Sequence, residues 1–200
     1  MQRDARWTNY NTLTWKQKVK KHNYDVLLGH EVSYRSTEYL LGEAMGFPFD
    51  QMGNDNMGLG ATPSKVESTF YDKTLLSFYA RTNYNYDNRY LFTATVRADG
   101  STVFSSNKKW GFFPSFSAAW RVSEEAFMKD VKWISNFKIR LGWGTVGNDN
   151  IPNYLSLDLY EANKYGIGNS SVTVLNPKQL RNKNLKWEGS NLSLIHISEP

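Results

Sequence analysis

The sequence predicts an all-β chain, and more specifically an antiparallel transmembrane β-barrel segment with long extracellular loops. Four segments between residues 75 and 148 alternate apolar and polar residues, and aromatic side chains gather near the ends of their apolar faces. Short and long connections also follow one another along the chain. Successive side chains of a strand point to opposite faces, so each segment has one apolar and one polar face. A barrel wall needs these two faces, toward lipid and lumen, with aromatic rings at the interfaces.

Two strands are expected near the N-terminus. Residues 12–20 alternate clearly, and residues 24–32 return after a tight turn at residues 21–23. Residues 33–69 lose the alternation and are rich in Gly, Pro, Asn and Met, so the sequence predicts a long loop there. Loops beyond ~15 residues are uncommon in compact soluble domains, whereas long external loops are usual in membrane barrels.

The next expected hairpin contains the clearest alternation in the chain. Residues 76–86 and 90–98 are separated by a short turn at Asp87–Asn88. Residues 100–110 then form a longer polar loop before a third strand at residues 115–122. Connections that alternate between short and long are typical of an up-and-down barrel that crosses a membrane repeatedly.

The C-terminal half continues the same plan. Ser123, placed as an N-cap before two glutamates, predicts a short helical turn ending near Met128. A fourth alternating strand spans residues 136–144, and a long connection at residues 147–184 follows it. Within that connection a weak strand is expected near residues 154–160. A last strand is expected to begin at residues 185–188.

The composition excludes several classes of protein. The chain has 200 residues, 40% of them hydrophobic, and no window approaches the ~18 continuous apolar residues of a spanning helix. The absence of cysteine excludes a disulfide scaffold, a Cys-ligated metal and thiol catalysis. The net charge of +5 is modest, and its lysine cluster at residues 16–21 fits a solvated strand end. Without a basic stripe interleaved with aromatics, we expect no nucleic-acid partner.

The residues that could perform chemistry do not form a catalytic or metal-binding set. His22, His30 and His196 share no ligand spacing. The Gly-Asn-Asp-Asn runs at Gly53 and Gly147 favour tight turns over calcium binding. The adjacent Glu124 and Glu125 fit a helix N-terminus better than a glycosidase pair. We therefore expect no enzyme activity, no cofactor and no metal.

Nine short blocks lie in order along the chain, at residues 84–86, 89–91, 97–101, 113–115, 119–121, 124–128, 137–140, 144–148 and 184–188. Together they resemble the SusC/RagA class of TonB-dependent outer-membrane transporters from Bacteroidetes. The resemblance covers roughly residues 7–191. It implies a 22-stranded barrel, of which this chain would hold about a third, closed by a plug and energised through TonB. It also implies a SusD-like surface lipoprotein as a lid, oligosaccharide or peptide cargo, and contact with outer-membrane lipid.

The expected site residues fall into three groups. The polar-face charges are expected to face the lumen, where they would solvate the interior and brace the plug, or contact cargo. The loop aromatics could stack on sugars or pack against the lid, and the strand-end aromatics would form an interfacial belt. The three groups are Arg81, Arg97, Asp99, Arg121, Lys138 and Arg140; Phe47, Phe49, Tyr160 and Tyr165; and Tyr84, Tyr86, Tyr90 and Trp120.

The expected domain organisation is a partial barrel at residues 1–192 and a non-native tail at residues 193–200. The tail resembles translated adapter sequence, and Met1 opens a polar run without a signal peptide, so we expect the natural N-terminus upstream. Two alternatives remain open at this point. One is a soluble β-sandwich that binds carbohydrate, with its apolar faces packed together, and the other is a passive outer-membrane barrel or adhesin.

Overall fold

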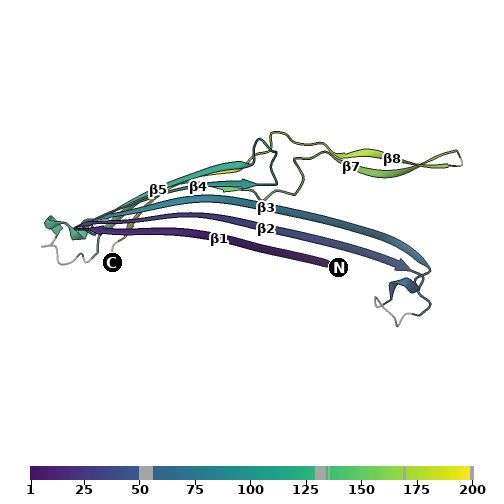
Figure 1. Cartoon of the computed structure of the whole chain (residues 1–200), viewed down its shortest axis with the longest axis horizontal. Coiled ribbons are helices and arrows are strands. Elements are labelled where there is room, and N and C mark those ends of the chain that lie inside the picture. The colour runs from purple at the N-terminus through teal and green to yellow at the C-terminus, as the bar shows by residue number, and fades with distance from the viewer. Residues whose placement is uncertain (50–55, 129–133, 135, 169, 199–200) are drawn as a thin grey trace.

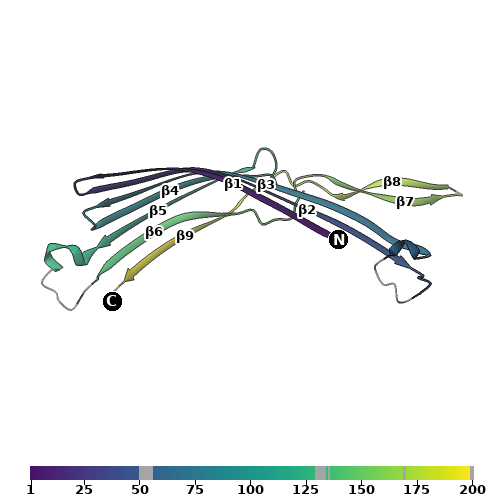
Figure 2. The same ribbon diagram turned by 60° about the horizontal axis from the view of Figure 1, so that its bottom comes forward.

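The computed structural model describes residues 1–49, 56–128, 134, 136–168 and 170–198. These residues form a curved, seven-stranded antiparallel sheet and a separate two-stranded hairpin (Figures 1 and 2). Within them, no helix is long and apolar enough to cross a bilayer. In spatial order the sheet contains β1 (Gln2–Val19), β2 (His22–Met45), β3 (Thr62–Tyr86), β4 (Tyr90–Ser101), β5 (Trp110–Arg121), β6 (Lys138–Asn148) and β9 (Glu188–Ser198), and the hairpin contains β7 (Leu159–Ile167) and β8 (Ser170–Gln179).

Short and long connections lie at opposite ends of the sheet, as the sequence predicts. The β1–β2 and β3–β4 turns and the β5–β6 connection gather at the left of Figure 1. Asp87 and Asn88 have φ of 51° and 57°, and the Arg89 N–H donates to the Tyr86 carbonyl over 3.0 Å. Two left-handed residues match the right-handed twist of the flanking strands, which explains this two-residue turn. The β2–β3 and β4–β5 connections and the β7–β8 hairpin lie at the other end.

The register divides the sheet into two faces. Leu28, Ala80, Val96 and Pro114 are directly opposite one another in neighbouring strands and therefore share a face. We call this side the apolar face and the opposite side the polar face. Among the described residues no second layer of strands or helices packs over the apolar face, and Leu13, for example, is 70% exposed. A single open layer contradicts the sandwich alternative, which requires two apolar faces in contact.

The prediction of a loop at residues 33–69 is wrong for most of these residues. β2 and β3 pair continuously from His22 with Tyr86 to Met45 with Thr62, with one irregularity at Glu43/Ala44. Outside a membrane both faces of a strand meet water, so alternation disappears although the backbone ladder continues. The connection that remains is residues 46–61, with a 3-10 turn at Met57–Leu59. The first Gly-Asn-Asp-Asn run lies outside the described residues except for its last Asn.

Two further details differ from the sequence expectation. The weak strand expected near residues 154–160 begins later than predicted, because residues 153–156 form a turn in which Tyr154 has a φ of 65° and β7 starts only at Leu159. The helical turn after β5 exists as two 3-10 turns, Val122–Glu124 and Ala126–Met128, but Ser123 does not cap it. Instead the Ser123 N–H donates to the Phe137 carbonyl over 3.2 Å, which extends the pairing toward β6.

Candidate functional site

Arg97 lies on the polar face of β4, the central strand of the sheet, and neighbouring polar side chains hold its guanidinium in place. The Arg97 Nε–H donates to both Asp99 carboxylate oxygens over 2.8 and 2.9 Å, and Nη2 donates to Ser77 Oγ over 2.9 Å. Arg97 Nη2 also lies 3.6 Å from a Glu31 carboxylate oxygen. Asp99 is only 7% exposed, so its charge depends on this partner. The cluster ties β2, β3 and β4 together across the polar face.

A glycine makes room for this cluster. Gly29, Tyr79 and Arg97 are directly opposite one another in β2, β3 and β4. The Tyr79 ring lies against Gly29, where an added Cβ would approach ring atoms to 2.5 Å. The Arg97 guanidinium in turn lies 5.4 Å from the Tyr79 ring centroid, a cation–π distance. The absence of a side chain at Gly29 therefore leaves room for the Tyr79 ring beside the Arg97 guanidinium.

The other expected lumen-facing charges also lie on the polar face, and they differ in their partners. Arg121 bonds the Glu124 carboxylate over 2.9 Å and the Asn88 carbonyl over 3.3 Å at the short-turn end. Lys138 is directly opposite Arg121, and Arg140 follows it in β6. In the part of the chain that the structure describes, Arg81, Lys138 and Arg140 form no ion pair. These three cations are available to another group, whereas Arg97, Asp99 and Arg121 are already paired.

A polar network at the short-turn end was not anticipated from the sequence. The Glu125 carboxylate accepts the Tyr90 hydroxyl over 2.7 Å, the Trp120 Nε1–H over 3.1 Å and Arg89 Nη1 over 3.1 Å. These partners, led by Tyr90 and Trp120, hold the pKa of Glu125 below its ordinary value. Asp87 extends the network, because it bonds Arg89 over 2.7 Å and Lys21 over 2.8 Å.

The hydrogen bond from Lys21 is the leading cause of the lowered pKa of Asp87. The network therefore links the β1–β2 turn, the β3–β4 turn and the β5–β6 connection. The pairing of Tyr90 with Trp120 across β4 and β5 was the signal that could have revealed this network. The Tyr90 hydroxyl and the Trp120 Nε1–H lie at the same strand end, and both need a hydrogen-bond acceptor.

Aromatic rings form two bands on the apolar face. At the short-turn end Tyr24 and Tyr84 lie 5.2 Å apart between ring centroids, and the expected belt residues Tyr84, Tyr86, Tyr90 and Trp120 all lie here. The second band, toward the other end, contains the pairs Trp7–Tyr34 and Phe78–Trp110, each with centroids 6.2 Å apart. Ten residue steps separate Tyr90 from Gly100, which is opposite Trp110. At ~3.3 Å per residue and a tilt of about 40°, the bands are about 25 Å apart, the height of a barrel's apolar belt.

The four loop aromatics do not form one platform. Phe47 and Phe49 follow β2, whereas Tyr160 and Tyr165 belong to the hairpin, and these are separate projections in Figure 1. Tyr160 and Tyr165 also point to opposite faces of the hairpin, because Tyr165 is an odd number of residue steps after Tyr160 along β7. A shared stacking surface for one sugar chain is therefore not built from these four residues.

The connections at the long-loop end pack together around Trp187. Its Nε1–H donates to the Lys109 carbonyl over 2.8 Å, and its ring lies 5.1 Å from that of Phe104 and 5.2 Å from that of Phe113. Tyr154 joins the assembly from the β6–β7 connection, and its hydroxyl donates to Asp72 over 3.1 Å. The Trp187 contacts hold the β4–β5 loop against the chain that precedes β9, and the Tyr154 bond holds the β6–β7 connection against β3. The sequence did not reveal this packing.

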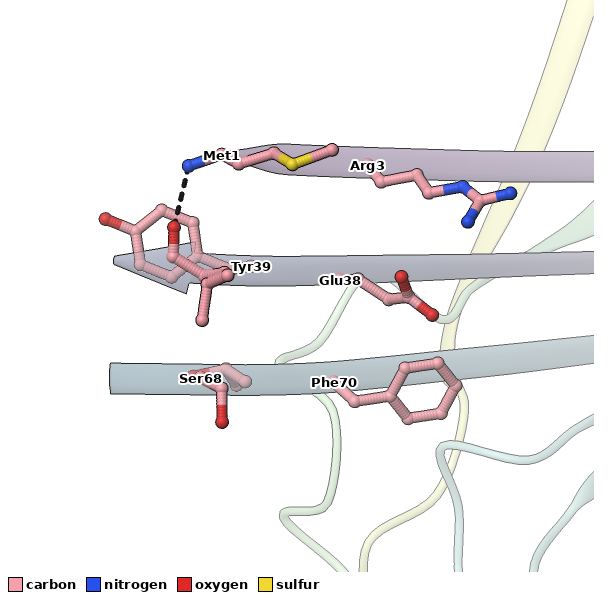
Figure 3. Close-up of a pocket in the computed structure, with 8 residues that line it drawn as sticks. Met1, Arg3, Glu38, Tyr39, Ser68 and Phe70 are labelled. Atoms are coloured by element: carbon pink, nitrogen blue, oxygen red, sulfur yellow. Dashed lines mark hydrogen bonds between the residues drawn. The ribbon is translucent and has the colours of Figure 1, made fainter. Parts of the chain in front are cut away.

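A shallow hollow of about 560 Å³ lies at the far end of β1, β2 and β3 (Figure 3). Arg3, Glu38 and Phe70 lie side by side there, and the Met1 amino group donates to the Leu40 carbonyl over 2.6 Å. The register places these side chains on the continuation of the apolar face, beyond the second aromatic band. The hollow therefore faces away from the polar face and does not contribute to a luminal site. Among the described residues, no group of three His, Cys, Asp or Glu side chains could hold a metal.

Comparisons with known proteins agree on one family. The family described as TonB dependent receptor-like, beta-barrel matches residues 1–191. The chain is 46% identical to the TonB-dependent receptor SusC of Bacteroides thetaiotaomicron over 120 residues, which are 58% of this chain and 12% of SusC. It is 35% identical to the TonB-dependent receptor P26 of Formosa agariphila over 191 residues, 92% of this chain and 19% of that receptor.

Among solved structures, the RagAB peptide transporter superposes with a TM-score of 0.90 at 26% identity. The match covers 99% of this chain and 22% of that chain. The chain therefore spans about a fifth or less of the length of these relatives.

Proposed function

The chain belongs to the TonB dependent receptor-like β-barrel family, and from this premise we propose that it forms part of the wall and outer loops of an outer-membrane importer for oligosaccharides or peptides. One observation carries the proposal. The sheet has an apolar face bounded by two aromatic bands, and its polar face carries paired charges at the centre. Such a surface suits lipid on one side and a water-filled lumen on the other.

The mechanism that we propose contains no covalent chemistry. Cargo binds among the outer loops beneath a SusD-like lipoprotein, and TonB then displaces a plug so that cargo can pass along the wall. The likeness to SusC and to the RagAB peptide transporter supports these partners. Arg81, Lys138 and Arg140 would contact the plug or cargo, since these three expected lumen-facing cations form no ion pair in the described residues. Arg97 and Asp99 would brace the wall.

An uptake assay tests this function. Cells with and without the receptor gene would be offered fluorescent neutral oligosaccharides, acidic oligosaccharides and oligopeptides, and accumulation would be measured with TonB present or deleted. Uptake that needs both the receptor gene and TonB supports the importer. Uptake that persists without the receptor gene overturns it, and uptake that needs the gene but not TonB identifies a passive barrel.

We also infer that residues 1–192 are the barrel portion and that residues 193–200 are a non-native tail. The family match ends at residue 191. Leu194 also places an apolar side chain on the polar face, directly opposite Gly142. Sequencing the source DNA past Asn191 tests the assignment: codons for a different strand support it, and codons for the same residues overturn it.

A further inference from the structure

A cleft at the long-loop end carries an unbalanced positive charge. It has a volume of about 590 Å³ and lies between the β4–β5 loop and the chain that links β6 to β9. Three basic side chains and no acidic side chain line it. The lining residues are Thr102, Phe104, Ser105, Ser106, Asn107, Lys109, Tyr154, Ser156, Leu157, Arg181 and Lys183.

Two of the three cations lack an internal partner. Arg181 is paired, because its Nε lies 3.4 Å from an Asp158 carboxylate oxygen. Across the ranges that the structure describes, Lys109 and Lys183 form neither an ion pair nor a side-chain hydrogen bond. Two ammonium groups beside one cleft repel each other, so an anionic ligand that enters the cleft is favoured electrostatically.

The uncharged side chains that line the cleft indicate the chemical class of the anionic ligand. The side chains of Ser106, Asn107 and Ser156 also make no hydrogen bond within the described chain. Hydroxyl and amide groups both donate and accept, which suits a chain rich in hydroxyl groups. The aromatic rings are less available: Phe104 is buried against Trp187, and the Tyr154 hydroxyl is bonded to Asp72.

The cleft is held in place by packing. The Trp187 indole bonds the Lys109 carbonyl, which fixes the backbone that carries this ammonium. On the opposite wall the Asn182 carbonyl accepts the Ser105 hydroxyl over 3.4 Å, and the Asn182 N–H donates to the Leu155 carbonyl over 3.1 Å. A pre-formed cleft loses less conformational entropy when it binds a ligand.

We propose that this cleft binds acidic oligosaccharides, with Lys109 and Lys183 contacting the carboxylate or other anionic substituents and the neutral side chains contacting hydroxyl groups. The proposal rests on the importer function, because it names the cargo class that such a receptor would select. It goes beyond that function in assigning the selectivity to two lysines in connections that are far apart in the sequence.

The test measures binding by calorimetry with the full-length receptor in detergent. The probes are an oligogalacturonate, a neutral maltooligosaccharide of equal length and an oligoglutamate peptide. The variant K109Q/K183Q removes both ammonium groups, and the matched control K108Q/K164Q removes two exposed lysines that do not line the cleft. We expect tight binding of oligogalacturonate alone. The Kd should rise about tenfold or more in K109Q/K183Q, since each lost bond to a charged group weakens binding severalfold or more.

The control should bind like the parent receptor, and added salt should weaken binding to the parent. Unchanged heat-dependent mobility on gels would show that both variants fold. Equal losses in both variants, comparable binding of the neutral sugar, or preferred binding of oligoglutamate would each overturn the proposal. A receptor that imports neutral cargo through TonB but does not bind oligogalacturonate would refute the acidic cleft and leave the importer function intact. If oligogalacturonate binds as expected but no import is seen, only the importer function fails.

Discussion

Arginine at Val96 should impair insertion of the sheet into the membrane. Val96 lies on the apolar face, 42% exposed, opposite Ala80 in β3 and Pro114 in β5. It is six residue steps from Tyr90 and four from Gly100, so it lies near the middle of the interval between the aromatic bands. A guanidinium at the bilayer midplane destabilises a barrel by about 2–4 kcal/mol. That range corresponds to roughly a 30- to 900-fold loss in the folding equilibrium.

The comparison variants are Leu141→Arg and Thr95→Arg. Leu141 is 49% exposed on the apolar face of β6, so we expect a loss of the same kind. Thr95 is on the polar face directly opposite Arg81, where a second arginine adds only cross-strand repulsion of about 1 kcal/mol or less. The assay is unfolding of the full-length receptor in lipid vesicles by urea, with outer-membrane assembly followed by heat-dependent gel mobility. Equal tolerance at positions 95 and 96 would refute the assignment of the two faces.

Three further predictions concern the polar face and the short-turn end. Gly29→Ala should destabilise the receptor by about 1–3 kcal/mol by overpacking, and in a Tyr79→Ala background the same change should cost much less in urea unfolding. Arg97→Gln should cost about 1–3 kcal/mol by leaving Asp99 unpaired, and adding Asp99→Asn should recover part of the loss in a double-mutant cycle. The lowered pKa of Glu125 means that its stabilising effect is present above its unfolded pKa of ~4.3 and disappears as pH falls through the lower folded value. The urea midpoints of the parent and Glu125→Gln should therefore converge in acid, and a difference that stays constant with pH would contradict this account.

The sequence predicted most of the membrane-facing part of the sheet. Alternation in residues 76–98 and 136–144 placed Val96 and Leu141 on the apolar face because lipid permits only apolar side chains there. The Asp87–Asn88 turn was equally clear, since few residues tolerate a positive φ. The family resemblance, built on ordered blocks along the same strands, is confirmed by the matched family and by the likeness to SusC.

Outside the part of the sheet where lipid requires apolar side chains, the sequence pattern did not predict the structure. Residues 33–45 are a strand without alternation, because both of its faces meet water and only the ladder with β3 specifies it. The alternation put Arg97 on the polar side of its strand, but its pairing with Ser77 and Glu31 required the register between three strands. The cleft was missed for a related reason: Lys109 and Lys183 come from different connections, and only packing around Trp187 brings those connections together.

The unequal strand lengths explain why the outer end can carry a selective surface. β2 and β3 contain 24 and 25 residues, whereas β4 and β5 contain 12 each. A strand needs only ~9–11 residues to cross a membrane, so β2 and β3 extend beyond the second aromatic band and β4 and β5 end near it. Because β3 is long, it carries Asp72 beyond the second aromatic band, where Asp72 bonds the Tyr154 hydroxyl. Because β4 and β5 are short, they leave space beyond their ends for the β4–β5 loop. The cleft lies beside this change in strand length, between the β4–β5 loop and the chain that links β6 to β9. Substitutions of the exposed Ser106 and Asn107 in that loop should therefore change which cargo binds while the urea midpoint of the barrel stays the same.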